Sequence, residues 1–96
     1  MVSVAVTARA QLQIDVIIDY LNARNPATGR NFLEQIKTAY RQLSEFPLSG
    51  IRGRTPNTRR LVVASFVLTY RNVPAGVEIV DIRHGRQLEA PLPEDV

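Results

Sequence analysis

Cysteine is absent from the 96 residues of the chain, which excludes disulfides and thiolate metal sites. Long apolar runs are absent too, and none approaches the roughly 20 residues that a helix needs to span a bilayer. The N-terminus has no basic segment ahead of an apolar stretch, which a signal peptide would have. We therefore expect a cytoplasmic protein that has no membrane partner.

Lysine is almost absent: eleven of the twelve basic residues are arginine, and Lys37 is the exception. Seven arginines lie between residues 51 and 87, against Glu78 and Asp81, whereas residues 89–96 form an acidic tail that need not pack on the domain. Because guanidinium groups pair well with phosphate and carboxylate groups, we expect this half to bind nucleic acid or an acidic protein segment. A solvated arginine face without a ligand is the alternative. The predicted target- or nucleic-acid-binding residues are Arg52, Arg54, Arg59, Arg60, Arg71, Arg83 and Arg86.

Two helices are predicted after a short opening strand at residues 2–6, which alternates weakly and is β-branched. Thr7 is a candidate N-cap for a helix over residues 8–23, and Asn25–Pro26 marks the start of a second helix that runs to about residue 46. The tight link between them predicts an antiparallel helical hairpin. Apolar residues at helical spacing predict its core-facing stripes: Ala10, Ile14, Ile17, Ile18 and Leu21, then Phe32, Ile36, Ala39, Tyr40 and Leu43.

Three strands are predicted in the second half of the chain, after the Gly-, Pro- and Thr-containing loop LSGIRGRTPNTRR. They cover residues 60–64, 66–71 and 77–84, and their short connections indicate an antiparallel meander. The predicted fold is therefore one α+β domain over residues 1–96 with the order β-α-α-β-β-β. In it, the helical hairpin packs on a small antiparallel sheet.

Several segments, in this order and spacing, resemble the RelE/ParE superfamily of type II toxins, or plasmid-stabilisation proteins: TARAQLQIDVIIDYL, NPATGRNFLEQI, LSEFPLSGIRGR, TRRLVVASFVLTYR and VEIVDIRHGRQ. The resemblance implies the same β-α-α-β-β-β fold and a growth-inhibiting toxin that a cognate antitoxin neutralises. ParE-like members poison DNA gyrase and show no recognised hydrolytic site. RelE-like members are ribosome-dependent mRNA endoribonucleases.

A ribonuclease reading depends on a few residues near the C-terminus. Cleavage of RNA through its 2′-OH needs a proton acceptor, cations for the charged phosphorane and a proton donor for the leaving oxygen. The candidates are His84 with Arg60 and Arg86, and Tyr70 is a weaker one because alternation does not fix its face. The sequence LEAPLPEDV, after Gln87, has no Tyr, His, Lys or Arg where many ribonuclease members of the superfamily place a terminal catalytic group.

His84 also suits a structural role, in which hydrogen bonds to the backbone or to Asp81 anchor the strand end. We therefore assign no catalytic residue, metal or cofactor and favour the ParE-like branch, which is not an enzyme, with the ribosome-dependent endoribonuclease as the alternative. A third alternative is a degenerate or antitoxin-dependent member without strong toxicity.

The resemblance also implies an antitoxin that folds part of its chain onto the toxin. Three apolar residues widen the stripe of the first helix beyond what one core face needs, and we predict that they bind the antitoxin: Leu12, Val16 and Tyr20.

Overall fold

The computed structural model describes residues 1–87, so the acidic tail predicted at residues 89–96 lies outside the described residues. The chain starts with β1 (Ser3–Val6), α1 (Ala8–Arg24) and α2 (Pro26–Glu45). Four strands follow, β2 (Ile51–Arg52), β3 (Thr58–Val63), β4 (Phe66–Val73) and β5 (Gly76–His84), and the 3-10 helix η1 (Gly85–Gln87) comes after them. No helix in the described part of the chain is long and apolar enough to cross a membrane.

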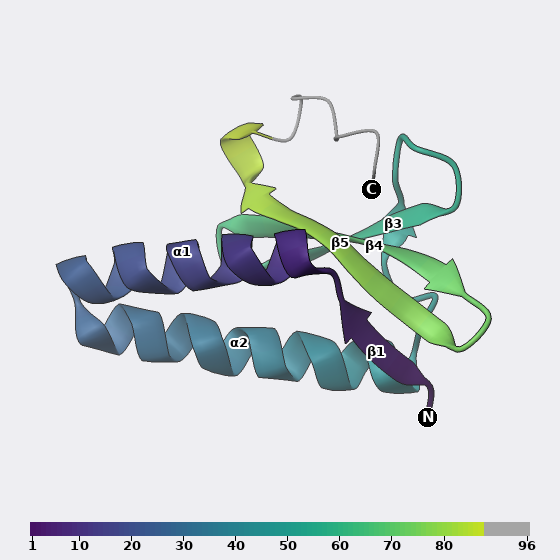
Figure 1. Cartoon of the computed structure of the whole chain (residues 1–96), viewed down its shortest axis with the longest axis horizontal. Coiled ribbons are helices and arrows are strands. Elements are labelled where there is room, and N and C mark those ends of the chain that lie inside the picture. The colour runs from purple at the N-terminus through teal and green to yellow at the C-terminus, as the bar shows by residue number, and fades with distance from the viewer. Residues whose placement is uncertain (88–96) are drawn as a thin grey trace.

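The helical hairpin forms where the sequence predicts it, because its capping residues make the expected hydrogen bonds. The Thr7 hydroxyl accepts a hydrogen bond from the Ala10 N–H and starts α1. Asn25 ends α1 by donating its N–H to the Leu21 carbonyl, and its side chain caps α2 by accepting from the Ala27 N–H. The two helices lie side by side and antiparallel (Figure 1).

The five strands form one sheet in the order β1-β5-β4-β3-β2. The predicted meander of β3, β4 and β5 is antiparallel and is confirmed. Two details differ from the prediction: β1 pairs in parallel with β5, and Ile51–Arg52 forms an additional short strand on β3. The local pattern of residues 2–6 specifies a strand but not the direction of its pairing, and a two-residue strand is too short to produce alternation.

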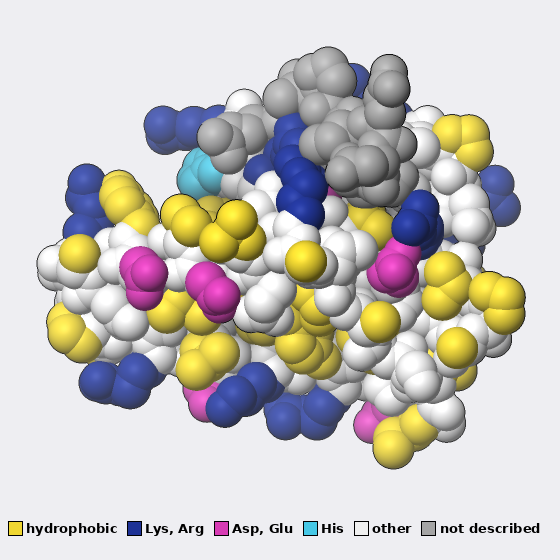
Figure 2. Space-filling view, viewed as in Figure 1, with side chains coloured by type: hydrophobic (Ala, Val, Ile, Leu, Met, Phe, Trp, Pro, Cys, Tyr) yellow, Lys and Arg dark blue, Asp and Glu magenta, His cyan; other side chains and the backbone are white. Residues whose placement is uncertain are grey.

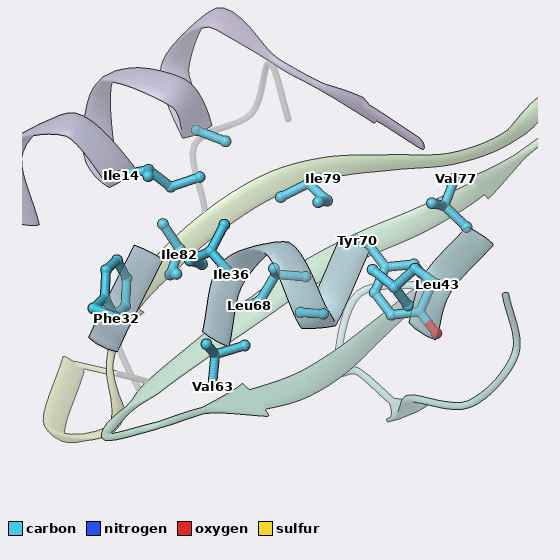
Figure 3. Packing of buried hydrophobic residues seen from close by; sticks show 12 residues of the cluster. Ile14, Phe32, Ile36, Leu43, Val63, Leu68, Tyr70, Val77, Ile79 and Ile82 are labelled. Atoms are coloured by element: carbon cyan, nitrogen blue, oxygen red, sulfur yellow. The ribbon is translucent and has the colours of Figure 1, made fainter. Parts of the chain in front are cut away.

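The core lies between the hairpin and one face of the sheet. Figure 3 shows side chains of α1 and α2 facing those of the strands, and the buried members of this cluster include Ile14, Phe32, Ile36, Leu43, Val63, Leu68, Val77, Ile79 and Ile82. The predicted stripes supply the helical side of this core, and their burial is the main favourable contribution to folding.

Tyr70 also belongs to this core and is fully buried. Its hydroxyl donates to the Pro47 carbonyl at 2.9 Å and accepts from the Gly50 N–H at 3.0 Å. These bonds fix the chain between α2 and β2 against β4. A substrate therefore has no access to this hydroxyl.

Candidate partner and target surfaces

An open groove of about 630 Å³ runs between α1 and the ends of β4 and β5. We call it the α1 groove, and its lining includes Leu12, Val16, Ile17, Phe66, His84 and Arg86. Leu12 and Val16 lie one helical turn apart and are 64% and 59% exposed, and Tyr20 continues the same row one turn further on. Figure 2 shows the histidine, in cyan, beside hydrophobic side chains and Lys/Arg side chains. The predicted antitoxin-binding residues thus lie in one row beside a basic end.

His84 closes this groove at the end of β5. Its ring meets Phe66 edge-on at 5.6 Å, and Phe66 in turn meets Phe32 of α2 at 5.2 Å, so His84 lies on the helix-facing side of the sheet. Its Nδ1 accepts a hydrogen bond from the backbone N–H of Arg86 at 3.1 Å. In the neutral ring the proton is therefore on Nε2, which can donate a hydrogen bond but has no lone pair to accept a proton.

Arg60 lies on the opposite face of the sheet from His84. Leu61 and Val63 of β3 pack toward the core, so the alternation of side chains along the strand directs Arg60 away from the helices. Arg86, by contrast, lines the α1 groove together with His84. The structure therefore brings together two of the three ribonuclease candidates and separates Arg60 from them.

The seven predicted arginines do not form one surface. Arg59 donates to the carbonyls of Leu48 and Gly50, and Arg71 pairs across the strands with Glu78. Arg83 is engaged by Asp81 and is nearly buried. The other predicted members, Arg52, Arg54, Arg60 and Arg86, are exposed or half-buried.

Asp81 is the centre of a network that the sequence did not assign to any site. It is fully buried, and it accepts hydrogen bonds from Arg9 and Gln13 of α1 and from Arg83 of β5, at 2.8, 3.0 and 2.8 Å. Burial raises the pKa of its carboxyl, but the hydrogen bonds from Arg83, Gln13 and Arg9 outweigh burial and hold the pKa below its usual value. The signal available in the sequence was a charged residue between two apolar ones, Val80 and Ile82.

Gln13, which donates to Asp81, also accepts a hydrogen bond from the backbone of β5. Its side-chain oxygen accepts the backbone N–H of Ile82 at 3.1 Å, at a point of β5 beyond the residues paired with β1. The glutamine thus replaces a neighbouring strand as hydrogen-bond partner at this edge. Together with Asp81, it fixes the wall of α1 that borders the groove.

Comparisons with known proteins agree on the toxins of the RelE/ParE superfamily. The profile described as "ParE toxin of type II toxin-antitoxin system, parDE" matches residues 4–89. A Sinorhizobium fredii protein, Y4kP, whose name describes it as a candidate toxin, is 35% identical over 83 residues, which are 84% of this chain and 85% of that protein. Toxin RelE2 of Caulobacter vibrioides is also 35% identical, over 89 residues that cover 92% of this chain and 100% of the relative.

A solved structure supports the fold. A chain of the chromosomal ParDE toxin–antitoxin system from P. aeruginosa superposes with a TM-score of 0.75. The match covers 88% of this chain and 96% of that chain, at 21% sequence identity. At that identity the match supports the arrangement of helices and strands alone.

Proposed function

The chain belongs to the ParE toxin family of type II toxin–antitoxin systems, and from that membership we propose that it acts in the cytoplasm as a growth inhibitor, poisons DNA gyrase and is neutralised by a cognate antitoxin. It does so without a hydrolytic active site. The single observation that carries the preference for gyrase over RNA cleavage is the position of Arg60, on the face of the sheet opposite to His84.

The hydrogen bonding of His84 supports the same conclusion. Its Nδ1 accepts a hydrogen bond from the Arg86 N–H, so the neutral ring presents the Nε2 N–H, a donor, to the groove.

The test is induced expression with two readouts, gyrase supercoiling and primer extension on mRNA. We expect inhibited supercoiling with intact mRNA, and the His84→Ala variant should inhibit supercoiling as the wild type does. Ribosome-dependent cuts that disappear in His84→Ala would instead support the endoribonuclease, for which His84 and Arg86 do lie on one groove. If neither readout responds, the chain is a member without strong toxicity.

The α1 groove is the proposed site for the antitoxin. Leu12, Val16 and Tyr20 recur every four residues on α1 and present an exposed apolar row, the geometry that an amphipathic segment of a partner can cover. The cations at the ends of the row, Arg86 and Arg24, would suit acidic residues on that segment.

The groove can be tested with the protein encoded beside the toxin. A Leu12→Glu/Val16→Glu double variant should weaken the complex at least about a hundredfold, because burying a carboxylate against an apolar surface is costly. Val62→Glu is a matched control, since Val62 is 73% exposed and lies on β3 away from the groove. Equal effects of the two changes would count against the groove as the antitoxin site.

A further inference from the structure

A second depression lies beside the loop that leads from β2 into β3, and it shares no lining residue with the α1 groove. It has a volume of about 480 Å³, and we call it the loop pocket. Its polar lining residues are Arg52, Thr55, Asn57, Thr58, Arg59 and Asn72, and none of the acidic residues within residues 1–87 lines it. A pocket of this size is large enough for a phosphate group and part of the molecule that carries it.

Two arginines face each other across the strands at this pocket. Arg52 of β2 is directly opposite Arg59 of β3. The Gly53 N–H donates to the Thr58 carbonyl at 2.8 Å, so by the alternation of an antiparallel ladder Arg52 and Arg59 form a non-hydrogen-bonded pair, in which side chains are closest. Two like charges in such a pair repel each other unless an anion or a hydrogen-bond acceptor compensates them.

The compensation inside the protein is incomplete. Arg59 places one guanidinium nitrogen between the carbonyls of Gly50 and Leu48, at 2.8 and 3.2 Å, which fixes the orientation of its planar group. Arg52 is exposed and makes no ion pair or hydrogen bond with the described residues. One arginine is thus held in place by the protein, and the other beside it has no acceptor within residues 1–87.

The loop that borders the pocket is fixed by its own hydrogen bonds. The Thr58 N–H and hydroxyl both donate to the Thr55 carbonyl, and the Asn57 side chain donates to the Asn72 carbonyl of β4 at 3.1 Å. Asn57 has a φ of 64°, a left-handed conformation that asparagine tolerates better than most residues. Because the loop is ordered before any ligand arrives, little conformational entropy would be lost on binding.

We propose that the loop pocket binds a backbone phosphate of nucleic acid, with Arg52 and Arg59 as its guanidinium ligands. Paired guanidinium groups match the oxygens of a phosphate. A phosphate fits better than a carboxylate, because two guanidinium groups line the pocket and the acidic residues within residues 1–87 do not. The acids of β5 do not neutralise Arg52, since Glu78 is paired with Arg71 and Asp81 with Arg9 and Arg83.

The site adds a nucleic-acid contact to the proposed function but does not depend on gyrase being the target. The test is fluorescence anisotropy of a labelled duplex of about 20 base pairs, titrated with the full chain at several salt concentrations. Arg52→Gln should weaken binding about tenfold and lower the slope of log K against log salt by about 1, as expected for one lost phosphate contact. Arg52→Lys keeps the charge but loses the forked guanidinium group, so its affinity for the duplex should lie between those of the wild type and Arg52→Gln.

Arg30→Gln and Arg41→Gln are the matched controls, because both residues are exposed on α2 and each variant loses the same charge. We expect them to weaken binding less than about twofold. Equal losses for all three variants would mean general electrostatic attraction and would overturn the site, as would a wild-type chain that does not bind the duplex at low salt.

Inorganic phosphate and a mononucleotide distinguish the source of the phosphate. Amide resonances of residues 53–58 other than Pro56, which has no N–H, should move on addition of duplex at far lower phosphate concentration than with either small molecule. Shifts with inorganic phosphate or mononucleotide but none with duplex would overturn the nucleic-acid assignment. These measurements use neither a growth assay nor a supercoiling assay. The binding result therefore does not depend on whether gyrase is the target.

Discussion

Asp81 shows how much one residue organises in this chain. Three side chains donate hydrogen bonds to its carboxylate, two from α1 and one from β5, and these bonds connect the helix to the strand. A charge without exposure to solvent is tolerated only where such partners replace the lost water. The sequence reveals the oddity of an aspartate within an apolar strand, but Arg9 and Gln13 are about 70 residues away along the chain, so only the fold identifies them as its partners.

Asp81→Asn should lower the free energy of unfolding by about 3 kcal/mol, because it removes the charge of a fully buried carboxylate that pairs with Arg83 and Arg9. Urea unfolding of the two proteins measures the difference. Asp19→Asn on the exposed face of α1 is the control and should change stability by less than about 0.5 kcal/mol.

The same comparison has a defined pH dependence. The pKa of Asp81 is lower in the folded chain than in the unfolded one, so its contribution is complete above the unfolded-state pKa of about 3.9 and is lost as the pH falls through the folded-state pKa. The difference in stability between wild type and Asp81→Asn should therefore shrink below about pH 4. A difference that stays constant from pH 7 to pH 3 would show that the carboxylate charge is not what Asp81 contributes.

At the scale of elements, β1 depends on a close approach that a single glycine permits. Gly76 has a φ of 150°, and a Cβ there would lie 2.2 Å from the carbonyl oxygen of Ser3, its partner in the parallel pair. Gly76→Ala should therefore weaken the pairing of β1 with β5 and lower the free energy of unfolding by about 3 kcal/mol, from backbone strain and steric overlap. Hydrogen exchange measures this effect: relative to the wild type, Gly76→Ala should accelerate exchange of the β1 amides more than exchange of the β4 amides.

Gly85 supplies the control for this prediction. A Cβ at Gly85 would meet its nearest atom, the Ser65 carbonyl oxygen, at 3.7 Å, an ordinary van der Waals contact. Gly85→Ala should change stability by less than about 0.5 kcal/mol. Unchanged exchange of the β1 amides in Gly76→Ala would show that the strand can shift to accommodate the methyl group.

The elements themselves were largely predictable from local signals. Thr7, Asn25 and Pro26 specify helix starts through backbone chemistry, and the stripe from Phe32 to Leu43 specifies a buried face. Pairing between distant segments has no such local signal. For that reason the sequence predicted the meander, whose strands are joined by short turns, but not the parallel partner of β1.

The surfaces were less predictable than the fold, because charge counts do not say which guanidinium groups the protein itself uses. Arg71 and Arg83 look like Arg52 and Arg86 in the sequence, yet the fold pairs both with carboxylates. Carbonyl groups hold one guanidinium nitrogen of Arg59. The exposed apolar row of Leu12 and Val16 was predictable, because helical periodicity places both residues beyond the core-facing stripe.

For the whole molecule, the two proposed sites lie toward opposite ends of the sheet. Phe66 lines the α1 groove and Asn72 lines the loop pocket, and the six residue steps between them along β4 span roughly 20 Å. Changes at sites this far apart that share no partner add independently. We therefore expect Arg52→Gln to leave the affinity for the antitoxin unchanged within about twofold, and Leu12→Glu/Val16→Glu to leave duplex binding unchanged to the same extent.

This independence has a consequence for the neutralised complex. An antitoxin segment confined to the α1 groove leaves Arg52 and Arg59 exposed to a ligand, so the complex should bind the labelled duplex with the same loss on Arg52→Gln as the free chain. If the antitoxin instead displaces the duplex, it must extend over the loop that leads into β3, and in that case Arg52→Gln should also weaken the toxin–antitoxin complex. Anisotropy titrations with and without saturating antitoxin distinguish the two arrangements, since each predicts a different response to the same substitution.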